Sequence, residues 1–220
     1  MTDAARHRPF DPAAMAPADA YHLLNAVVVP RPIGWVSTLS ERGVANLAPH
    51  SYFNVLAADP PTVFFSSSGV KDSLRNARHT GDFVVNVVGE ALAEAMNLTS
   101  ADFPPDESEF AAAGLTPVPS DLVKAPRLLE APASLECRVT QIIEIGRGPN
   151  QVVIGEVVRF HVAEAALVNG RVDVSRFRPL GRLSGSGYVY SREFLSMPRP
   201  TYAGLVEAGT VKPATEHSSR

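Results

Sequence analysis

The chain has 220 residues, a formal net charge of −3 and no block of basic residues, so nucleic acid is not an expected partner. Its single cysteine, Cys137, excludes a disulfide within the chain and is typical of proteins from a reducing cytoplasm. No apolar run approaches the roughly 18 residues that span a bilayer, and residues 1–20 lack the apolar core of a secretory signal. We therefore expect a cytoplasmic protein that does not enter the membrane.

One folded domain is predicted, because all-β barrels commonly reach this length and no linker-like segment divides the chain. Residues 1–16 lack hydrophobic periodicity and are predicted to form an N-terminal arm. Residues 17–200 are predicted to form the domain, and residues 201–220 a flexible polar tail.

Short apolar segments separated by polar clusters fill the first half of the chain. A helix is predicted to begin at Pro17 and to end before Pro30, since a residue that precedes proline avoids the helical region. Gly43 is expected to supply the positive φ of a turn between two strands, and Pro49 to end the second of them. The strands predicted in this half cover residues 34–40, 44–48, 51–56, 62–66 and 83–88. The last of these is almost wholly apolar and is expected to be central in the sheet.

Helices are predicted at residues 71–80, 90–98 and 108–114, and two long strands at residues 134–145 and 151–162. An Asn-Gly pair at Asn169 predicts a further hairpin. In the first long strand, alternation is expected to place five residues on one face: Leu135, Cys137, Val139, Gln141 and Ile143. Hairpin-linked strands with helices between them predict a mainly β fold, an antiparallel β-barrel with helical insertions.

The common catalytic signatures are absent from the sequence. It contains no dinucleotide-binding glycine motif, no Walker A sequence and no Gly-x-Ser-x-Gly elbow. The six histidines show no metal-ligand spacing, so no metal site is expected. Cys137 lies within an apolar strand pattern and is interpreted as a buried thiol.

Small hydroxyl and amide side chains instead gather where the predicted strands end. They are Ser37, Thr38, Asn46, Ser51, Ser66, Ser67 and Ser68, followed by Lys71. Neutral donors beside a cation and a helix start suit a phosphate group. Capping of the helix by the same serines is the more common explanation of such a pattern, and the residues alone leave both interpretations open.

Several blocks in a fixed order carry a family resemblance. They read Arg31-Pro-Ile-Gly-Trp-Val-Ser-Thr, Asn46-Leu-Ala-Pro-His-Ser-Tyr-Phe-Asn, Pro60-Pro, Phe65-Ser-Ser-Ser, Lys71-Asp-Ser-Leu-Arg-Asn, Thr80-Gly-Asp-Phe-Val-Val-Asn and Pro179-Leu-Gly-Arg-Leu-Ser-Gly. Over about residues 20–200 the chain resembles the flavin reductase-like, FMN-binding split-barrel family, in its flavoredoxin-like long form. Ser73 departs from the common form, which has threonine there, but keeps the hydroxyl.

The resemblance implies a homodimer of split barrels with one FMN per subunit near the dimer interface. It implies that residues 35–38 lie beside the flavin ring and ribityl chain, residues 46–51 at the ring edge, and residues 66–71 around the phosphate, with Ser73 near it. The cofactor-binding residues expected from it are Trp35, Val36, Ser37, Thr38, Asn46, Leu47, Ala48, Ser51, Ser66, Ser67, Ser68, Lys71 and Ser73. It leaves open whether the segment from Arg182 to Tyr188 reaches the site. No catalytic role is assigned to His50, because a histidine between Pro49 and Ser51 is equally explained as a loop residue.

The implied activity is that of an NAD(P)H:flavin oxidoreductase, in which hydride passes from the nicotinamide to flavin N5. No catalytic side chain is expected, because the cofactor carries the chemistry. Electrons would continue to free flavin, to oxygen, or to a partner such as a monooxygenase. Two alternatives remain: an FMN electron carrier or flavin oxidase without NAD(P)H activity, and a non-enzymatic flavin-binding or sensor module.

Overall fold

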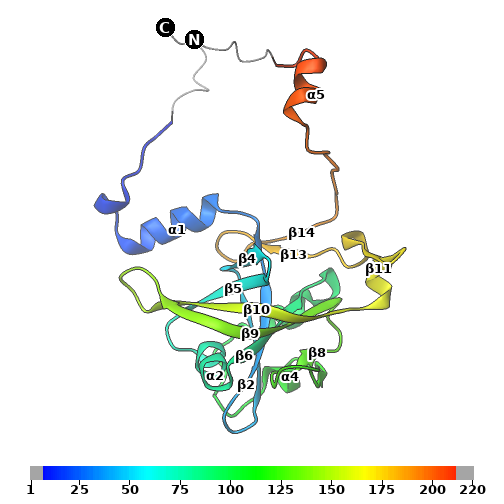
Figure 1. Ribbon diagram of the computed structural model, residues 1–220. Coiled ribbons are helices and arrows are strands. Elements are labelled where there is room, and N and C mark those ends of the chain that lie inside the picture. Colours follow the sequence, from blue (N-terminus) through cyan, green and yellow to red (C-terminus); the bar gives the residue numbers. More distant parts are fainter. Residues whose placement is uncertain (1–6, 212–220) are drawn as a thin grey trace.

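A single antiparallel sheet of seven strands forms the body of the protein in the computed structural model, which describes residues 7–211 (Figure 1). The strand order is β3-β2-β6-β9-β10-β5-β4. The bounds are β2 (Gly34–Leu39), β3 (Ala45–His50), β4 (Phe53–Ala58), β5 (Pro61–Ser68), β6 (Asp82–Val87), β9 (Ala133–Glu144) and β10 (Asn150–Val162). The expected mainly β, antiparallel fold is confirmed.

Shorter elements cover the ends of this sheet. In the small sheets, β13 (Leu180–Arg182) pairs with both β1 (Arg31–Pro32) and β14 (Tyr188–Tyr190), β7 (Pro117–Val118) pairs with β8 (Arg127–Leu128), and β11 (Leu167–Val168) pairs with β12 (Arg171–Val172). The α-helices are α1 (Pro17–Val27), α2 (Asp72–Thr80), α3 (Ala93–Leu98), α4 (Glu109–Ala112) and α5 (Tyr202–Glu207). Single 3-10 turns lie at η2 (Pro12–Ala14), η3 (Glu90–Leu92), η4 (Glu164–Ala166) and η5 (Val174–Arg176).

Two apolar clusters stabilise the barrel. In the first, the rings of Phe65 and Phe83 meet edge to face with centroids 5.2 Å apart, and Leu74 of α2 packs against them. The second surrounds Trp35, which is fully buried together with Met96 and other apolar side chains of α3, α4 and β3. Strand β6 lies inside the sheet, between β2 and β9, and is buried on both faces, which agrees with its predicted interior position.

Pro49 does not end a strand, and the prediction that it would is wrong. Strand β3 continues through Pro49 to His50, and Pro49 pairs with Trp35 in the register. β3 is the outermost strand at its end of the sheet and has a ladder on one side only, and edge strands are where sheets tolerate proline.

A β-bulge breaks the face expected to run from Leu135 to Ile143. Gln141 pairs with Ile154 and Val139 with Gly155, so Thr140 is an extra residue in β9. The extra residue reverses the alternation, and Ile142 packs against the core while Ile143 is 39% exposed. The prediction of one continuous face is therefore wrong beyond Val139.

Both ends of the chain leave the barrel on the side that carries α1 (Figure 1). Residues 7–16 are mostly exposed and contain only η2. In the predicted C-terminal tail, Thr201 caps α5 by accepting the N–H of Gly204 at 3.2 Å. Residues 1–6 and 212–220 of the predicted arm and tail lie outside the described residues. Within residues 7–211, no helix has the length and apolar character needed to cross a membrane.

Candidate functional site

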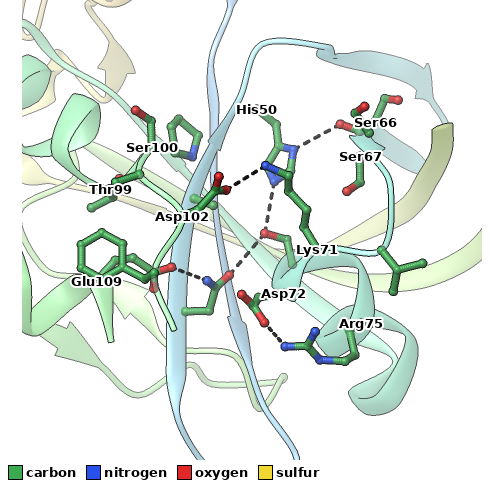
Figure 2. A pocket seen from close by; sticks show the side chains of 18 of the residues that line it. His50, Ser66, Ser67, Lys71, Asp72, Arg75, Thr99, Ser100, Asp102 and Glu109 are labelled. Carbon is green, nitrogen blue, oxygen red and sulfur yellow. Dashed lines mark hydrogen bonds and ion pairs between the residues drawn. The ribbon is translucent and has the colours of Figure 1, made fainter. Parts of the chain in front are cut away.

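A cavity of about 590 Å³ opens where β3, β5, the start of α2 and the loop of residues 99–105 meet (Figure 2). Its walls are mixed polar and apolar, and its volume lies within the range of small-molecule sites. The residues around it are Tyr21, Asn46, Ala48, Pro49, His50, Ser51, Tyr52, Ser66, Ser67, Ser68, Val70, Lys71, Asp72, Ser73, Arg75, Thr99, Ser100, Ala101, Asp102, Phe103, Pro105, Glu109 and Asn150.

The start of α2 supplies free hydrogen-bond donors to this cavity. Lys71 holds the N-cap position in extended conformation, and no side chain caps the helix. The nearby serines therefore do not act as caps; Ser67 instead donates its hydroxyl to the carbonyl oxygen of Gly69 at 2.8 Å. The first N–H groups of a helix carry partial positive charge, so an uncapped start beside Lys71 favours an anion.

The two cations of the cavity are paired with carboxylates. Lys71 Nζ lies 3.0 Å from Asp102 Oδ1, and both side chains are largely exposed, at 61% and 89%. Arg75 forms an ion pair with Asp72 one turn earlier in α2. Exposed pairs of this kind contribute little free energy, about 0–1 kcal/mol, so Lys71 can exchange Asp102 for another anion at small cost.

His50 links β3 to β5 and to α2. Its Nδ1 lies 3.2 Å from the carbonyl oxygen of Ser66, and its Nε2 lies 3.2 Å from Ser73 Oγ. The pKa of His50 is lowered to about 4, chiefly by burial; the hydrogen bond to the Ser66 carbonyl opposes this shift, and the charge of Lys71 adds to it. The ring is therefore neutral at physiological pH and acts as a fixed hydrogen-bonding group.

A buried carboxylate, Glu109 of α4, forms the other end of the same network. Its Oε1 accepts from Asn46 Nδ2 at 2.6 Å and its Oε2 accepts from the N–H of Leu47 at 2.9 Å. These bonds leave Asn46 Oδ1 to accept from the hydroxyl of Thr38 at 3.3 Å. Ser73 Oγ lies 3.2 Å from the same oxygen and 3.2 Å from His50 Nε2, and its one proton can be donated to either acceptor. Burial raises the pKa of Glu109, partly offset by the two donors. The sequence pointed to no role for this residue.

Eight of the thirteen expected binding residues line the cavity. They are Asn46, Ala48, Ser51, Ser66, Ser67, Ser68, Lys71 and Ser73. The five others are buried in the barrel: Trp35, Val36, Ser37, Thr38 and Leu47. Trp35 still reaches the cavity wall indirectly, because its Nε1–H donates to Thr99 Oγ1 at 2.9 Å.

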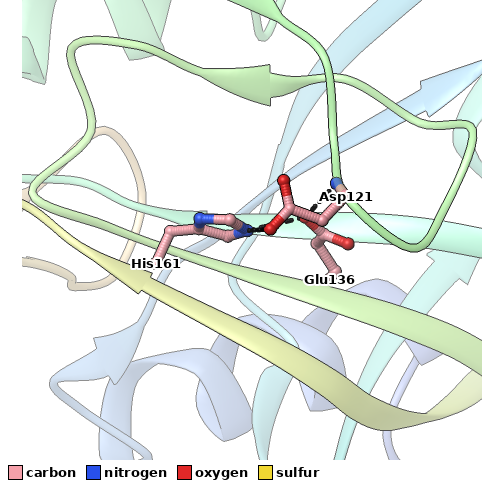
Figure 3. Close-up of side chains that lie close together, drawn as sticks. All are labelled: Asp121, Glu136 and His161. Atoms are coloured by element: carbon pink, nitrogen blue, oxygen red, sulfur yellow. Dashed lines mark hydrogen bonds and ion pairs between the residues drawn. The ribbon is translucent and has the colours of Figure 1, made fainter.

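A second polar cluster lies apart from this cavity, where Asp121, Glu136 and His161 approach one another (Figure 3). The fully buried Glu136 accepts the N–H groups of Asp121 and Leu122 at 2.8 and 2.7 Å, and it lies 2.6 Å from His161 Nε2. Protein donors thus engage both of its oxygens. The cluster is explained as an anchor that holds the loop around Asp121 against β9 and β10.

Because the pKa of His50 is low in the folded protein, we expect the stability of the protein to depend on pH. The unfolded chain takes up a proton near pH 6.5, whereas the folded chain does so only at about pH 4, so the free energy of unfolding decreases as the pH falls between these values. NMR titration of the His50 ring should give a midpoint near 4, and His50→Gln should remove this part of the pH dependence. A midpoint near 6.5 would contradict the geometry described for His50.

Comparison with known proteins places the chain in a family. The family model for the flavin reductase like domain matches residues 26–180. An uncharacterised protein of Halalkalibacterium halodurans is 41% identical over 87% of this chain and 96% of its own. Among solved structures, nitrilotriacetate monooxygenase component B from Bacillus cereus has a TM-score of 0.83 at 36% identity, covering 87% of this chain and 99% of its own. The 2-nitrobenzoate 2-nitroreductase of Pseudomonas fluorescens has a TM-score of 0.82 at 34% identity, covering 89% and 98%. The resemblance seen in the sequence is thereby confirmed: this chain belongs to the flavin reductase-like family of split-barrel proteins.

Proposed function

We propose that the protein binds FMN in the cavity beside α2 and acts as an NAD(P)H:flavin oxidoreductase. The observation that carries the proposal is the donor set at one end of this cavity. Three serines of β5, the uncapped start of α2, Lys71 and Ser73 converge there. Neutral donors around a single exchangeable cation suit a phosphate monoester.

The rest of the cavity fits the remainder of an FMN molecule. Asn46 and Ser51 lie on its wall next to backbone groups of β3, where they can meet the polar edge of the flavin ring. Glu109 fixes the orientation of the Asn46 amide, and the neutral His50 fixes Ser73. These contacts are made between groups of the chain itself, so they restrict the orientations of Asn46 and Ser73.

A bound flavin supplies the redox chemistry, since its ring accepts and returns electrons. The protein binds the phosphate, orients the ring and limits the access of water. No side chain needs to move a proton in this scheme, which agrees with the low pKa of His50 and with the structural bonds made by Glu109.

The electron acceptor is proposed from the relatives. Likeness to a monooxygenase component B favours a monooxygenase partner that receives reduced flavin. Likeness to a 2-nitrobenzoate 2-nitroreductase favours a second candidate function, the direct reduction of a nitroaromatic compound at the same flavin. An electron carrier or a sensor module on this fold would bind flavin without turning over NAD(P)H.

Anaerobic titration tests the proposal and separates these alternatives. Purified protein loaded with FMN should be yellow. NADH or NADPH should reduce the bound flavin, with loss of the yellow colour, on the timescale of enzymatic turnover. Bleaching followed by reoxidation on addition of a nitroaromatic acid would favour the second candidate. Protein that takes up no FMN would overturn the whole proposal, and FMN that is bound but not reduced would leave only the carrier or sensor function.

Lys71 provides the sharpest test of the phosphate position. Lys71→Ala should weaken FMN binding by about 1.5–3 kcal/mol, the contribution of a hydrogen bond to a charged group. Riboflavin, which lacks the phosphate, should bind the variant and the parent equally well. Fluorescence titration with both flavins measures this, and Lys124→Ala, which removes an exposed lysine outside the cavity, is the matched control. Unchanged FMN affinity would show that the phosphate lies elsewhere.

We also propose that the protein is a homodimer. Strand β4 is an edge strand, and its apolar residues Val55 and Leu56 are 69% and 54% exposed. The end of α1 adds Leu24 and Val27, at 54% and 67%. Asn25 of α1 donates to the hydroxyl of Tyr52 at 2.9 Å, so the two surfaces adjoin. An unpaired apolar edge of this kind favours association with a second copy of the chain.

Sedimentation velocity tests the homodimer. The parent protein should have about twice the mass of the 23.5 kDa chain at micromolar concentration. Val55→Glu should shift it toward monomer, because the dimer would bury an unpaired carboxylate. The control Val172→Glu, which changes a 51% exposed valine of β12, should stay dimeric. A monomeric parent would contradict the proposal.

A further inference from the structure

A second cavity of about 400 Å³ adjoins the one proposed for the flavin. The two share four lining residues, Tyr21, Pro49, Ser51 and Ser100. The others come mainly from α1, β1, α3 and the segment that follows β13: His22, Asn25, Arg31, Ile33, Met96, Arg182, Leu183, Ser184, Gly185 and Tyr188. None of these described lining residues is acidic, whereas two are arginines.

Arg31 is a buried cation without a carboxylate partner among residues 7–211. It is only 8% exposed. One terminal nitrogen donates to the carbonyl oxygens of Asn25 and Val28 at 3.1 and 2.9 Å, and the other donates to that of Leu183 at 3.0 Å. Its Nε has no hydrogen-bond partner in the described part of the chain. Carbonyl groups orient a guanidinium but leave its full charge in place, which is costly in a buried position.

Arg182 adds a second positive charge. It lies over the ring of Tyr188, with 4.5 Å between Cζ and the ring centroid, and it donates to the carbonyl oxygen of Gly185. It has no carboxylate partner in the described ranges. The flavin cavity differs in this respect, because there Lys71 and Arg75 each have an aspartate partner.

Apolar surface lies beside these charges. Tyr188, Tyr21, Met96 and Ile33 line the same cavity. A ligand that fits this combination carries an oxyanion for the arginines and a planar or apolar body for the rings. Since the walls of the two cavities are shared, such a ligand would lie next to a flavin bound in the first.

We propose that this second cavity binds the oxyanion, a carboxylate or a phosphate, of the organic electron donor or acceptor that reacts with the flavin. The role of this ligand as an electron donor or acceptor rests on the proposed flavin function, whereas the binding of an oxyanion in the second cavity does not. Two sources offer this chemistry: a small aromatic acid, through its carboxylate, and a nicotinamide dinucleotide, through its pyrophosphate.

Isothermal titration calorimetry of the FMN-loaded protein tests the site with three probes: benzoate, its neutral isostere benzamide, and inorganic pyrophosphate. At least one of the anions should bind about tenfold or more tightly than benzamide. Arg182→Gln should lower the affinity for that anion by about tenfold, as expected for the loss of one charge-assisted hydrogen bond. The affinity for FMN should change by less than about twofold. Arg192→Gln is the matched control, because Arg192 lies outside the cavity and pairs with Glu90.

The two sources give different results, and each supports the site. A small acid as ligand predicts tight benzoate binding and an unchanged KM for NAD(P)H in Arg182→Gln. A dinucleotide predicts tight pyrophosphate binding and a raised KM. The inference is overturned if benzamide binds as tightly as both anions, or if Arg182→Gln leaves the affinity for both anions unchanged. It is also overturned if Arg182→Gln lowers the affinity for FMN as much as that for the anion, which would place the flavin phosphate in this cavity. Protein that binds no FMN would refute the proposed function, while benzoate and pyrophosphate titrations of that same protein would still decide this site.

Discussion

The short connection between β3 and β4 is the constraint on which the site depends. These strands lie at opposite ends of the seven-stranded sheet, yet only Ser51 and Tyr52 join them. The sheet must therefore curl until its two outer strands approach. Two hydrogen bonds hold the approach: the N–H of Ser66 donates to the carbonyl oxygen of Tyr52 at 2.8 Å, and His50 Nδ1 lies 3.2 Å from the carbonyl oxygen of Ser66. The cavity proposed for the flavin is the space where these outer strands meet.

Where the outer strands β3 and β4 approach each other, some backbone groups have no partner in the sheet, and buried side chains form hydrogen bonds to them. Glu109 accepts the N–H of Leu47 and orients Asn46. Asn76 donates to Thr38 at 3.1 Å, which connects α2 to the same network. A half-satisfied network would be costly in a buried position, so these contacts make the geometry of the wall specific. The wall can therefore present Asn46 and Ser73 to a ligand in fixed orientations.

The sequence predicted the elements well because they depend on local patterns. The turn at Gly43 has the expected positive φ of 78°, and Asn169 and Gly170 adopt positive φ in the predicted hairpin. Errors arose where tertiary context decides. Pro49 is tolerated because β3 is an edge strand, and the bulge at Thr140 depends on pairing with β10. Neither feature has a signal within its own segment.

In the candidate site, too, the sequence predicted what local patterns decide and missed what tertiary contacts decide. Residues on the polar ends of β3 and β5 line the cavity, as their positions in the pattern suggested. The segment around Trp35 to Thr38 instead supports the wall from within, because β2 lies between β3 and β6 and is buried on both faces. Glu109 had no signal, since 63 positions separate it from Asn46 and only the folded chain brings them together.

The two cavities differ in how their positive charges are paired, and therefore in how strongly local charge favours an anionic ligand. The chain as a whole has a formal charge of −3, so an anionic ligand gains no long-range attraction from it. Binding must then rely on local cations. In the cavity proposed for the flavin, Lys71 already has an exchangeable partner in Asp102, which lowers the free energy that an anion gains by binding there. The second cavity has Arg31 and Arg182 with only carbonyl and ring partners among the described residues, so the same anion would gain more. A phosphate in the first cavity thus needs its neutral donors as well as Lys71, whereas the second can hold a simple oxyanion by charge.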